Sequence, residues 1–196
     1  MKGFRSRENP ARWKGNLDHL FPARSKVRPI RHHPSLPYVK VGEFVSELAQ
    51  RTELAARALE FLILTATRTS EALQARWDEV DFERKIWTIP ARRMKAAREH
   101  RVPLSDRALL ILSELHQDRI SEYVFAGMKS GRPLSQMALL MLLRRLDSQS
   151  ITVHGFRSTF RDWTAEQTNF SREVAEAELA HTISNAVEAA YRRVVR

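Results

Sequence analysis

The sequence predicts a mainly α-helical fold with a small antiparallel β-sheet, an α+β class of domain. Apolar residues recur at helical spacing through most of the chain from residue 38 onward. Only two short runs, at 86–89 and 101–104, are typical of strands, and a basic turn separates them. We therefore expect one domain over 38–196, with a small sheet inserted among its helices.

Capping residues and apolar periodicity place the individual elements. Apolar residues share one face of a helix over 40–50. Thr52 is the expected N-cap of an apolar helix over 53–65, and Ser105 is expected to cap a helix that ends near residue 117. The remaining expected elements are helices over 69–75, 135–146, 154–167, 171–179 and 185–195, and a short strand over 123–125.

The first part of the chain differs from the rest. Residues 1–37 contain five of the eight prolines, and they carry nine Lys or Arg against two acidic residues, a net charge of +7. Proline removes a backbone donor and interrupts helices, so prolines at this density disfavour a packed domain. We expect a basic arm or linker with at most one short helical turn.

Composition excludes several classes of protein. The chain has 196 residues, a net charge of +10 and no cysteine. Without cysteine there is no disulfide scaffold, no thiolate zinc site and no cysteine nucleophile. No stretch approaches the roughly 20 apolar residues of a membrane span, and no apolar run follows the N-terminus as in a signal peptide. These observations predict a cytoplasmic protein with no membrane partner.

The positive charge is concentrated in two segments. Residues 1–37 carry +7 and residues 84–107 carry +6, so the rest of the chain sums to −3. The segments are either two solvated basic loops or two strips that contact a phosphate backbone. Arginine outnumbers lysine 26 to 7. That ratio suits bidentate phosphate recognition, although the base composition of the gene could also produce it.

Two of the four motifs that bear on chemistry lie in the first half of the chain. Arg68 directly follows the apolar helix, and Glu71 stands three residues later, where it can orient the guanidinium across one helical turn. Lys95 lies in the turn between the two expected strands. The structural alternatives are an ordinary helix ion pair and a solvated hairpin tip. The functional alternatives are an arginine aimed at an anion and an ammonium delivered to a phosphate or a leaving oxygen.

The other two motifs lie near the end of the chain. His154 and Arg157 share one face at the start of a helix, where backbone N–H groups also favour an anion. His181 precedes a late helix on which Tyr191 adjoins two arginines. A single histidine or tyrosine is more often a packing residue, so the combination carries the functional interpretation.

Together these residues suit one reaction, in which a tyrosine attacks a DNA phosphodiester and forms a phosphotyrosyl intermediate. Free tyrosine has a pKa near about 10, so it needs a base or cationic surroundings. Two arginine forks and a histidine donor can stabilise charge on the non-bridging oxygens without a metal, and a lysine can protonate the departing 5′ oxygen. The chain supplies this set in order as Arg68, Lys95, His154, Arg157, His181 and Tyr191.

The chain resembles the catalytic domain of tyrosine recombinases, and most closely the phage and genomic-island integrases of the satellite-phage type. The resemblance covers nearly the whole chain. Each motif is moderately specific, and their order and spacing together are highly specific. The motifs are LTATRTSE at 64–71, RMK at 93–95 with HRVPL at 100–104, HGFR at 154–157, and LAH at 179–181 followed by AAY at 189–191.

The resemblance implies the tyrosine recombinase catalytic-domain fold and site-specific DNA recombination, as in prophage or genomic-island integration and excision. Strand exchange then proceeds through a 3′-phosphotyrosyl link and a free 5′-hydroxyl, with neither a metal nor another cofactor. By this analogy Arg68 and Arg157 clamp the scissile phosphate, and Lys95 is the general acid.

The same resemblance gives roles to the remaining residues. Tyr191 is the nucleophile, and His154 assists proton transfer to or from it. His181 hydrogen-bonds a non-bridging oxygen, and Glu71 supports the site from behind the arginine. The expected partner is double-stranded DNA at an attachment site. The residues expected to bind DNA in the two basic segments are Lys26, Arg28, Arg31, Arg92, Arg93, Arg98 and Arg101.

The chain departs from the family pattern in three places. Ala66 stands where many members have glycine, residues 1–37 resemble only the end of a core-binding domain and its linker, and the chain stops five residues after Tyr191. We therefore expect a fragment that is monomeric in solution, from a family that acts as a homotetramer on DNA.

Other functions stay open from sequence. The chain could be a catalytically silent DNA-binding remnant of an integrase, and a type IB topoisomerase would share the chemistry. A metallo-hydrolase is disfavoured, because His32 and His33 have no nearby carboxylates, and His154 and His181 lack metal-ligand spacing.

Overall fold

The computed structural model describes residues 9, 11–21 and 34–181, which fall in two units, 1–32 and 33–196. In the smaller unit a turn over Trp13–Leu17, in which Lys14 and Gly15 have non-helical backbone angles, leads into α1 (Asp18–Leu20). None of the residues described in these two turns is buried. The expected short helical turn of the arm is therefore present, and the residues described in it form no core.

The larger unit begins at His33, a few residues before the expected boundary at 38. The carbonyl of Pro34 accepts hydrogen bonds from the backbone N–H and the hydroxyl of Thr152, at 3.0 and 3.2 Å. A Cβ at Gly155 would lie 2.2 Å from that same carbonyl oxygen. Glycine is thus required at the start of this helix because the backbone of 34–35 passes directly over it.

The helices confirm the sequence expectation within one or two residues at each end. Apolar periodicity predicted them because each buries one face. The expected helix over 185–195 lies outside the described residues. The observed helices of the larger unit are α3 (Val41–Ala49), α4 (Leu54–Thr65), α5 (Thr69–Leu73), α6 (Asp106–Gln117), α7 (Gln136–Arg145), α8 (Gly155–Gln167) and α9 (Arg172–Glu178).

Helix capping agrees with the sequence at α6 and differs at α4. The Ser105 hydroxyl accepts from the Ala108 N–H at 3.3 Å, as expected of an N-cap. At α4 the cap position is Glu53 instead of Thr52, and its side chain makes no capping hydrogen bond. The expectation for Thr52 was therefore wrong; burial of the apolar face of α4, rather than a cap, accounts for this helix.

The sheet contains three antiparallel strands in the order β1 (Val80–Asp81), β2 (Ile86–Ile89) and β3 (His100–Pro103). The sequence did not predict β1, because two residues show no alternation. The expected strand over 123–125 was wrong. Only one isolated bridge forms there, between Tyr123 and Arg76. It is not extended, because a 3-10 helix begins at Trp77, the residue after Arg76.

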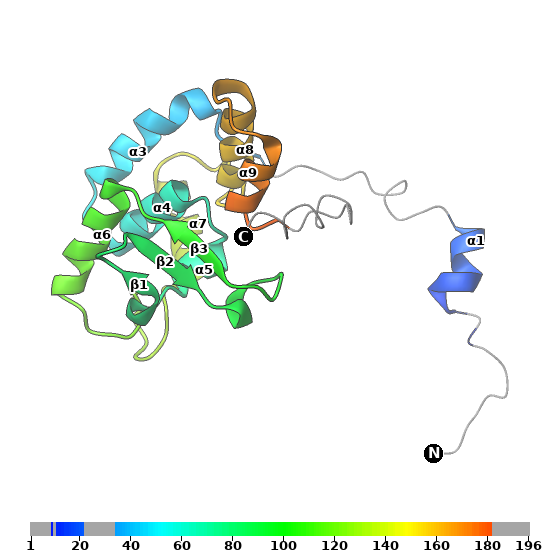
Figure 1. Ribbon diagram of the computed structural model, residues 1–196, viewed down its shortest axis with the longest axis horizontal. Coiled ribbons are helices and arrows are strands. Elements are labelled where there is room, and N and C mark those ends of the chain that lie inside the picture. Colours follow the sequence, from blue (N-terminus) through cyan, green and yellow to red (C-terminus); the bar gives the residue numbers. More distant parts are fainter. Residues whose placement is uncertain (1–8, 10, 22–33, 182–196) are drawn as a thin grey trace, which may run out of the picture. The chain divides into compact units, whose positions relative to one another are not determined.

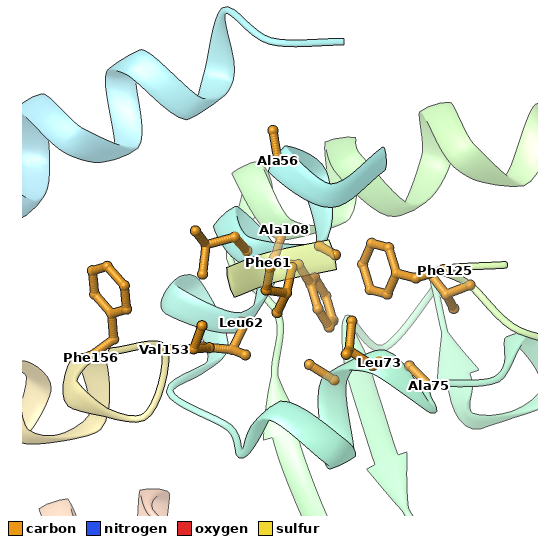
Figure 2. Packing of buried hydrophobic residues seen from close by; sticks show 14 of the residues in the cluster. Ala56, Phe61, Leu62, Leu73, Ala75, Ala108, Phe125, Val153 and Phe156 are labelled. Atoms are coloured by element: carbon orange, nitrogen blue, oxygen red, sulfur yellow. The ribbon is translucent and has the colours of Figure 1, made fainter. Parts of the chain in front are cut away.

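The core is centred on α4, which packs against α3, α5, α6 and α7. In Figure 1 the sheet and the α8–α9 pair lie at different ends of the larger unit, with α4 between them. Phe61 of α4 contacts Trp87 and Phe125, with ring centroids 5.3 and 5.6 Å apart. Figure 2 shows Phe156 at the opposite edge of this cluster from Phe125. One continuous core therefore joins the sheet to the start of α8.

The register of β2 and β3 decides which side chains face this core. Trp87 lies opposite Val102, and Ile89 lies opposite His100. Directly paired residues share a face of the sheet, and Trp87, Ile89 and Val102 are fully buried. His100 is thus directed inward, whereas Arg101 alternates outward.

Candidate active site

Arg68 and Glu71 form a compact unit at the start of α5. One Glu71 carboxylate oxygen accepts from the backbone N–H of Arg68 at 2.9 Å. The other accepts from the Arg68 guanidinium at 2.7 Å. Glu71 is buried and Arg68 is half-buried. The carboxylate therefore fixes both the helix start and the direction of the guanidinium.

Arg157, on the first turn of α8, is the most deeply buried cation of the site, with 5% of its surface exposed. Its guanidinium donates to the carbonyls of Ala66 and Leu179, both at 2.5 Å, and lies 3.1 Å from His181 Nε2. Burial, and secondly the positive charge of Arg68, lower the pKa of Arg157 to about 10. Among the described residues Arg157 has no carboxylate within 4.0 Å, so its charge is buried without a direct counter-ion.

The ends of α4 and α9 bring the two arginines together. Ala66 ends α4 and Ala180 follows α9, and both are in the left-handed conformation, with φ of 48° and 49°. The Ala66 carbonyl receives Arg157, and the Ala180 carbonyl receives Arg68 at 3.4 Å. Helix C-terminal carbonyls carry partial negative charge. The site therefore uses backbone carbonyls to hold two cations that would otherwise repel each other.

His181 follows α9 directly and is held from both sides of its ring. Nδ1 lies 2.5 Å from a Glu176 carboxylate oxygen, and Nε2 faces Arg157. The side chain of His181 is 38% exposed and that of Glu176 is 16% exposed. The imidazole thus stands between a partly buried carboxylate and the arginine pair.

Lys95 and His154 approach from two other elements. Lys95 is exposed in the loop between β2 and β3, and His154 is exposed at the N-cap of α8. Both line an open cavity of about 550 Å³ whose wall also contains Arg68, Glu176 and His181. Four of the six residues expected to act in catalysis therefore line one cavity, and Arg157 lies against its histidine.

The remaining expected residues differ in how the structure places them. Tyr191, Lys26, Arg28 and Arg31 lie outside the described residues. Three arginines of the hairpin are exposed to solvent, where they are accessible to a phosphate backbone. They are Arg92, Arg98 and Arg101.

Arg93 differs from the other hairpin arginines expected to bind DNA, because its side chain is mostly buried and engaged within the protein. Its side chain is 10% exposed and is ion-paired with Glu79, which is itself buried. It also donates to the backbone carbonyl of Glu71. Arg107, in the same basic segment, is likewise ion-paired with fully buried Glu60. Part of the positive charge of 84–107 thus has a structural role, and Arg93 holds the hairpin against α5.

Two residues of the site were missed in the sequence. Glu176 was missed because it stands five positions before His181, a spacing that does not make neighbours within a helix. His100 was missed because it begins a strand; its inward register places it near Arg68 and Arg157. The signal for His100 was available in principle, since Ile89 must pair with it if Trp87 pairs with Val102.

His100 makes folding stability depend on pH. Burial is the largest influence on its pKa and lowers it; Arg157 and Arg68 also lower it, against Glu71 and a hydrogen bond to the Glu178 backbone. Its Nε2 is buried and has no hydrogen-bond partner among the residues that the structure describes. As pH falls, His100 is therefore protonated in the unfolded chain before it is protonated in the folded protein. Its contribution to the free energy of unfolding is fully present above the ordinary pKa of 6.5, and it is lost as pH falls toward the lower pKa of the folded state.

We expect the urea unfolding free energy to fall between pH 7.5 and pH 5, and to fall less in His100→Gln. Burial raises the pKa of nearby Glu178, which acts in the opposite direction. The informative quantity is therefore the difference between the two proteins at each pH. Parallel curves for the wild type and the variant would contradict this role of His100.

Neither a metal site nor a membrane helix is found in the described part of the chain. Within residues 9, 11–21 and 34–181, no cluster of three or more His, Asp or Glu side chains could hold a metal ion. Over the same residues no helix has the length and apolar character needed to cross a membrane.

The fold and the site define a mainly helical domain that presents paired cations, an imidazole and a lysine to one open cavity. The phage integrase family model matches residues 41–196. The integrase of Enterobacteria phage P4 is 35% identical over 180 residues, which cover 82% of this chain and 41% of that protein. Prophage integrase IntZ of Escherichia coli K12 is 36% identical over 159 residues, covering 80% of this chain and 40% of the relative.

The chain belongs to the phage integrase family, the tyrosine recombinases, as the sequence motifs indicated. A structure of a lambda integrase tetramer bound to a Holliday junction has a TM-score of 0.60 at 16% identity, over 81% of this chain and 50% of that one. This likeness confirms the expected catalytic-domain fold. The chain spans about two fifths of the length of the P4 and IntZ integrases.

Proposed function

We propose that this chain is the catalytic domain of a site-specific DNA recombinase, which cleaves and rejoins DNA through a phosphotyrosyl intermediate during integration or excision of a mobile element. Family membership supports this proposal, because the P4 and IntZ relatives are integrases. The partner is double-stranded DNA at an attachment site in the cytoplasm, and the assembled form on DNA is a homotetramer. The chain alone is a monomer.

The observation that carries the proposal is the buried charge of Arg157 beside Arg68. A buried cation is costly unless an opposite charge or several hydrogen bonds compensate it. Arg157 donates hydrogen bonds to two carbonyls, but the charged side chain with the largest influence on it is Arg68, another cation. A phosphodiester placed against both guanidiniums supplies the missing negative charge, and each fork can donate two N–H groups to it.

The proposed first step forms one bond and breaks one. The Tyr191 hydroxyl oxygen attacks phosphorus and its proton passes to His154, while the bond between phosphorus and the 5′ oxygen breaks. Lys95 donates a proton to that oxygen, which leaves as a 5′-hydroxyl. Arg68, Arg157 and His181 stabilise the charge that gathers on the non-bridging oxygens.

The second step reverses the first with a different strand. A 5′-hydroxyl attacks the phosphotyrosine, Lys95 accepts its proton, and the Tyr191 oxygen leaves with a proton from His154. No bond energy is lost to hydrolysis, so no energy source is needed. Arg92, Arg98 and Arg101 contact the DNA backbone beside the site, and Lys26, Arg28 and Arg31 extend this contact along the arm.

The test captures the covalent intermediate on DNA of randomised sequence, so that the protein itself selects its attachment site. Duplexes carry one 5′-bridging phosphorothiolate flanked by randomised base pairs, and the 196-residue chain is added in EDTA. We expect an adduct that survives denaturation, whose recovered DNA converges on a sequence. Peptide mapping should find the nucleotide on Tyr191 and not on Tyr38 or Tyr123.

Three outcomes would overturn the proposal in different ways. Salt-sensitive DNA binding without an adduct would indicate a silent DNA-binding remnant. An adduct on another tyrosine would refute the assignment of the nucleophile. Relaxation of supercoiled plasmid with no sequence convergence would indicate a topoisomerase.

A further inference from the structure

The contact between Glu176 and His181 is created by the way the chain leaves α9. The backbone N–H of His181 donates to the Glu176 carbonyl at 2.9 Å, and that of Ala180 donates to the Ala177 carbonyl at 2.9 Å. With Ala180 at φ 49°, these two bonds form a Schellman motif. The motif turns His181 back over the last turn of α9, so that its side chain meets that of Glu176.

In most such motifs the two side chains that meet are apolar. Here they are a carboxylate and an imidazole, with Glu176 Oε2 and His181 Nδ1 2.5 Å apart. The Glu176 side chain is 16% exposed, so water competes weakly for this bond. A hydrogen bond of this length to a charged group, partly shielded from water, restrains the orientation of the His181 ring.

The chemistry of the two groups decides where the ring proton resides. An ionised carboxylate only accepts hydrogen bonds, so Nδ1 of His181 carries the proton that it donates to Glu176. On the other side the guanidinium of Arg157 only donates, and in the neutral ring Nε2 is the acceptor that meets it at 3.1 Å. Glu176 therefore selects the tautomer that directs Nε2 toward the arginine pair.

The charge of Glu176 also reaches Arg157. Glu71 and Glu176 both oppose the lowering of the Arg157 pKa by burial and by Arg68. Glu71 is already hydrogen-bonded to Arg68, whereas Glu176 is hydrogen-bonded to His181, which contacts Arg157. Glu176 thus stabilises the side of the site formed by Arg157 and His181.

We propose that Glu176 is a positioning residue that fixes the tautomer and the ring orientation of His181 in the resting protein. With Nδ1–H held by Glu176, Nε2 is directed at the phosphate position, where uptake of a second proton from solvent lets it donate to a non-bridging oxygen. The proposal rests on the proposed function for its effect on cleavage. It also concerns the resting protein, where it holds independently of any DNA. Glu176 itself touches neither the phosphate nor the leaving oxygen.

The first test reads the tautomer directly in the DNA-free protein. Long-range ¹H–¹⁵N correlation spectra of the histidine rings should show the proton of His181 on Nδ1. In Glu176→Ala this signature should give way to a mixture of tautomers, whereas Glu47→Gln, which removes an exposed carboxylate hydrogen-bonded to Arg51, should leave it unchanged. A proton on Nε2 in the wild type would overturn the proposal.

The second test is a double-mutant cycle on the rate of adduct formation. Glu176→Ala should slow cleavage about 10- to 100-fold, as the loss of residues that orient a functional histidine does elsewhere, with unchanged affinity for DNA. In a His181→Ala background the same substitution should cost less than about two-fold, because the residue acts through the histidine. Glu176→Gln should recover part of the rate, since its amide oxygen still accepts from Nδ1.

The outcomes separate this proposal from the one on which it rests. Independent, additive losses for Glu176→Ala and His181→Ala would show that Glu176 does not act through the histidine. If the wild type forms no adduct, the proposed function fails, and the spectra still decide whether Glu176 sets the tautomer. If Glu176→Ala loses thermal stability but its His181 keeps the wild-type tautomer, Glu176 only stabilises the end of α9 and the proposal is wrong.

Discussion

Replacing Arg157 with alanine should slow covalent cleavage by about 10²- to 10³-fold, the usual effect of removing one donor from a site that stabilises developing negative charge. The expectation follows from burial: Arg157 is 5% exposed, and the charge of Arg68 acts on its guanidinium. A phosphate bound there is held in a place where water screens it poorly. Arg157→Lys should remain strongly impaired, because one ammonium cannot reproduce the planar fork that reaches both the Ala66 and the Leu179 carbonyls.

The same substitution also has a structural effect, so the experiment must separate the two. Alanine leaves two buried carbonyls without their donor, at a cost of about 1–3 kcal/mol each. Unfolding curves and DNA affinity should therefore accompany the single-turnover rates. Arg161→Ala is the matched control, since it removes the same charge from an exposed position one turn later on α8. An Arg157→Ala protein that is folded and cleaves within about three-fold of the wild type would refute the phosphate clamp.

The sequence was sufficient for the helices because their signals are local. Apolar spacing and serine caps lie within one element, and the helices formed where those signals predicted them. The failures depended on neighbours. β1 is two residues long and exists only because Val80 pairs with Trp87. The segment over 123–125 has strand composition, but the segment opposite it enters a 3-10 helix directly after Arg76, so only one bridge forms.

The site divides in the same way. Residue types and order were enough to select Arg68, Lys95, His154, Arg157 and His181. The structure places four of them on one cavity and Arg157 against His181. What each side chain is bonded to could not be predicted. Whether an arginine is available to an anion depends on distant carboxylates, as the pairing of Arg93 with Glu79 demonstrates.

Contacts made by helix ends were equally inaccessible to pattern analysis. The Ala66 carbonyl meets Arg157, 91 residues later, only because α4 and α8 share the core. Glu176 meets His181 only because Ala180 adopts a left-handed conformation. Both Ala66 and Ala180 adopt the left-handed conformation, which alanine does not favour. The tertiary structure, and not local preference, therefore sets these contacts.

Lys95→Ala should slow cleavage of an ordinary phosphodiester by about 10²- to 10⁴-fold, the typical contribution of a general acid. Lys95 is the only lysine that lines the cavity within the described residues, and it is exposed on the loop before β3. Its ammonium can thus reach a leaving 5′ oxygen without disturbing the buried arginines. The rate is measured on a nicked duplex of the sequence recovered by adduct capture, with Tyr191→Phe as the zero-rate reference.

A sulfur leaving group distinguishes a proton donor from a mere cation. A thiol has a pKa near about 8.5, so a 5′-bridging sulfur leaves as an anion and needs no acid. Lys95→Ala should therefore cleave the phosphorothiolate duplex at nearly the wild-type rate, whereas Arg157→Ala should stay slow on both substrates. Lys85→Ala, which removes an exposed lysine paired with Asp106, should be normal on both. Equal losses on oxygen and sulfur in Lys95→Ala would mean that this ammonium stabilises phosphate charge and donates no proton.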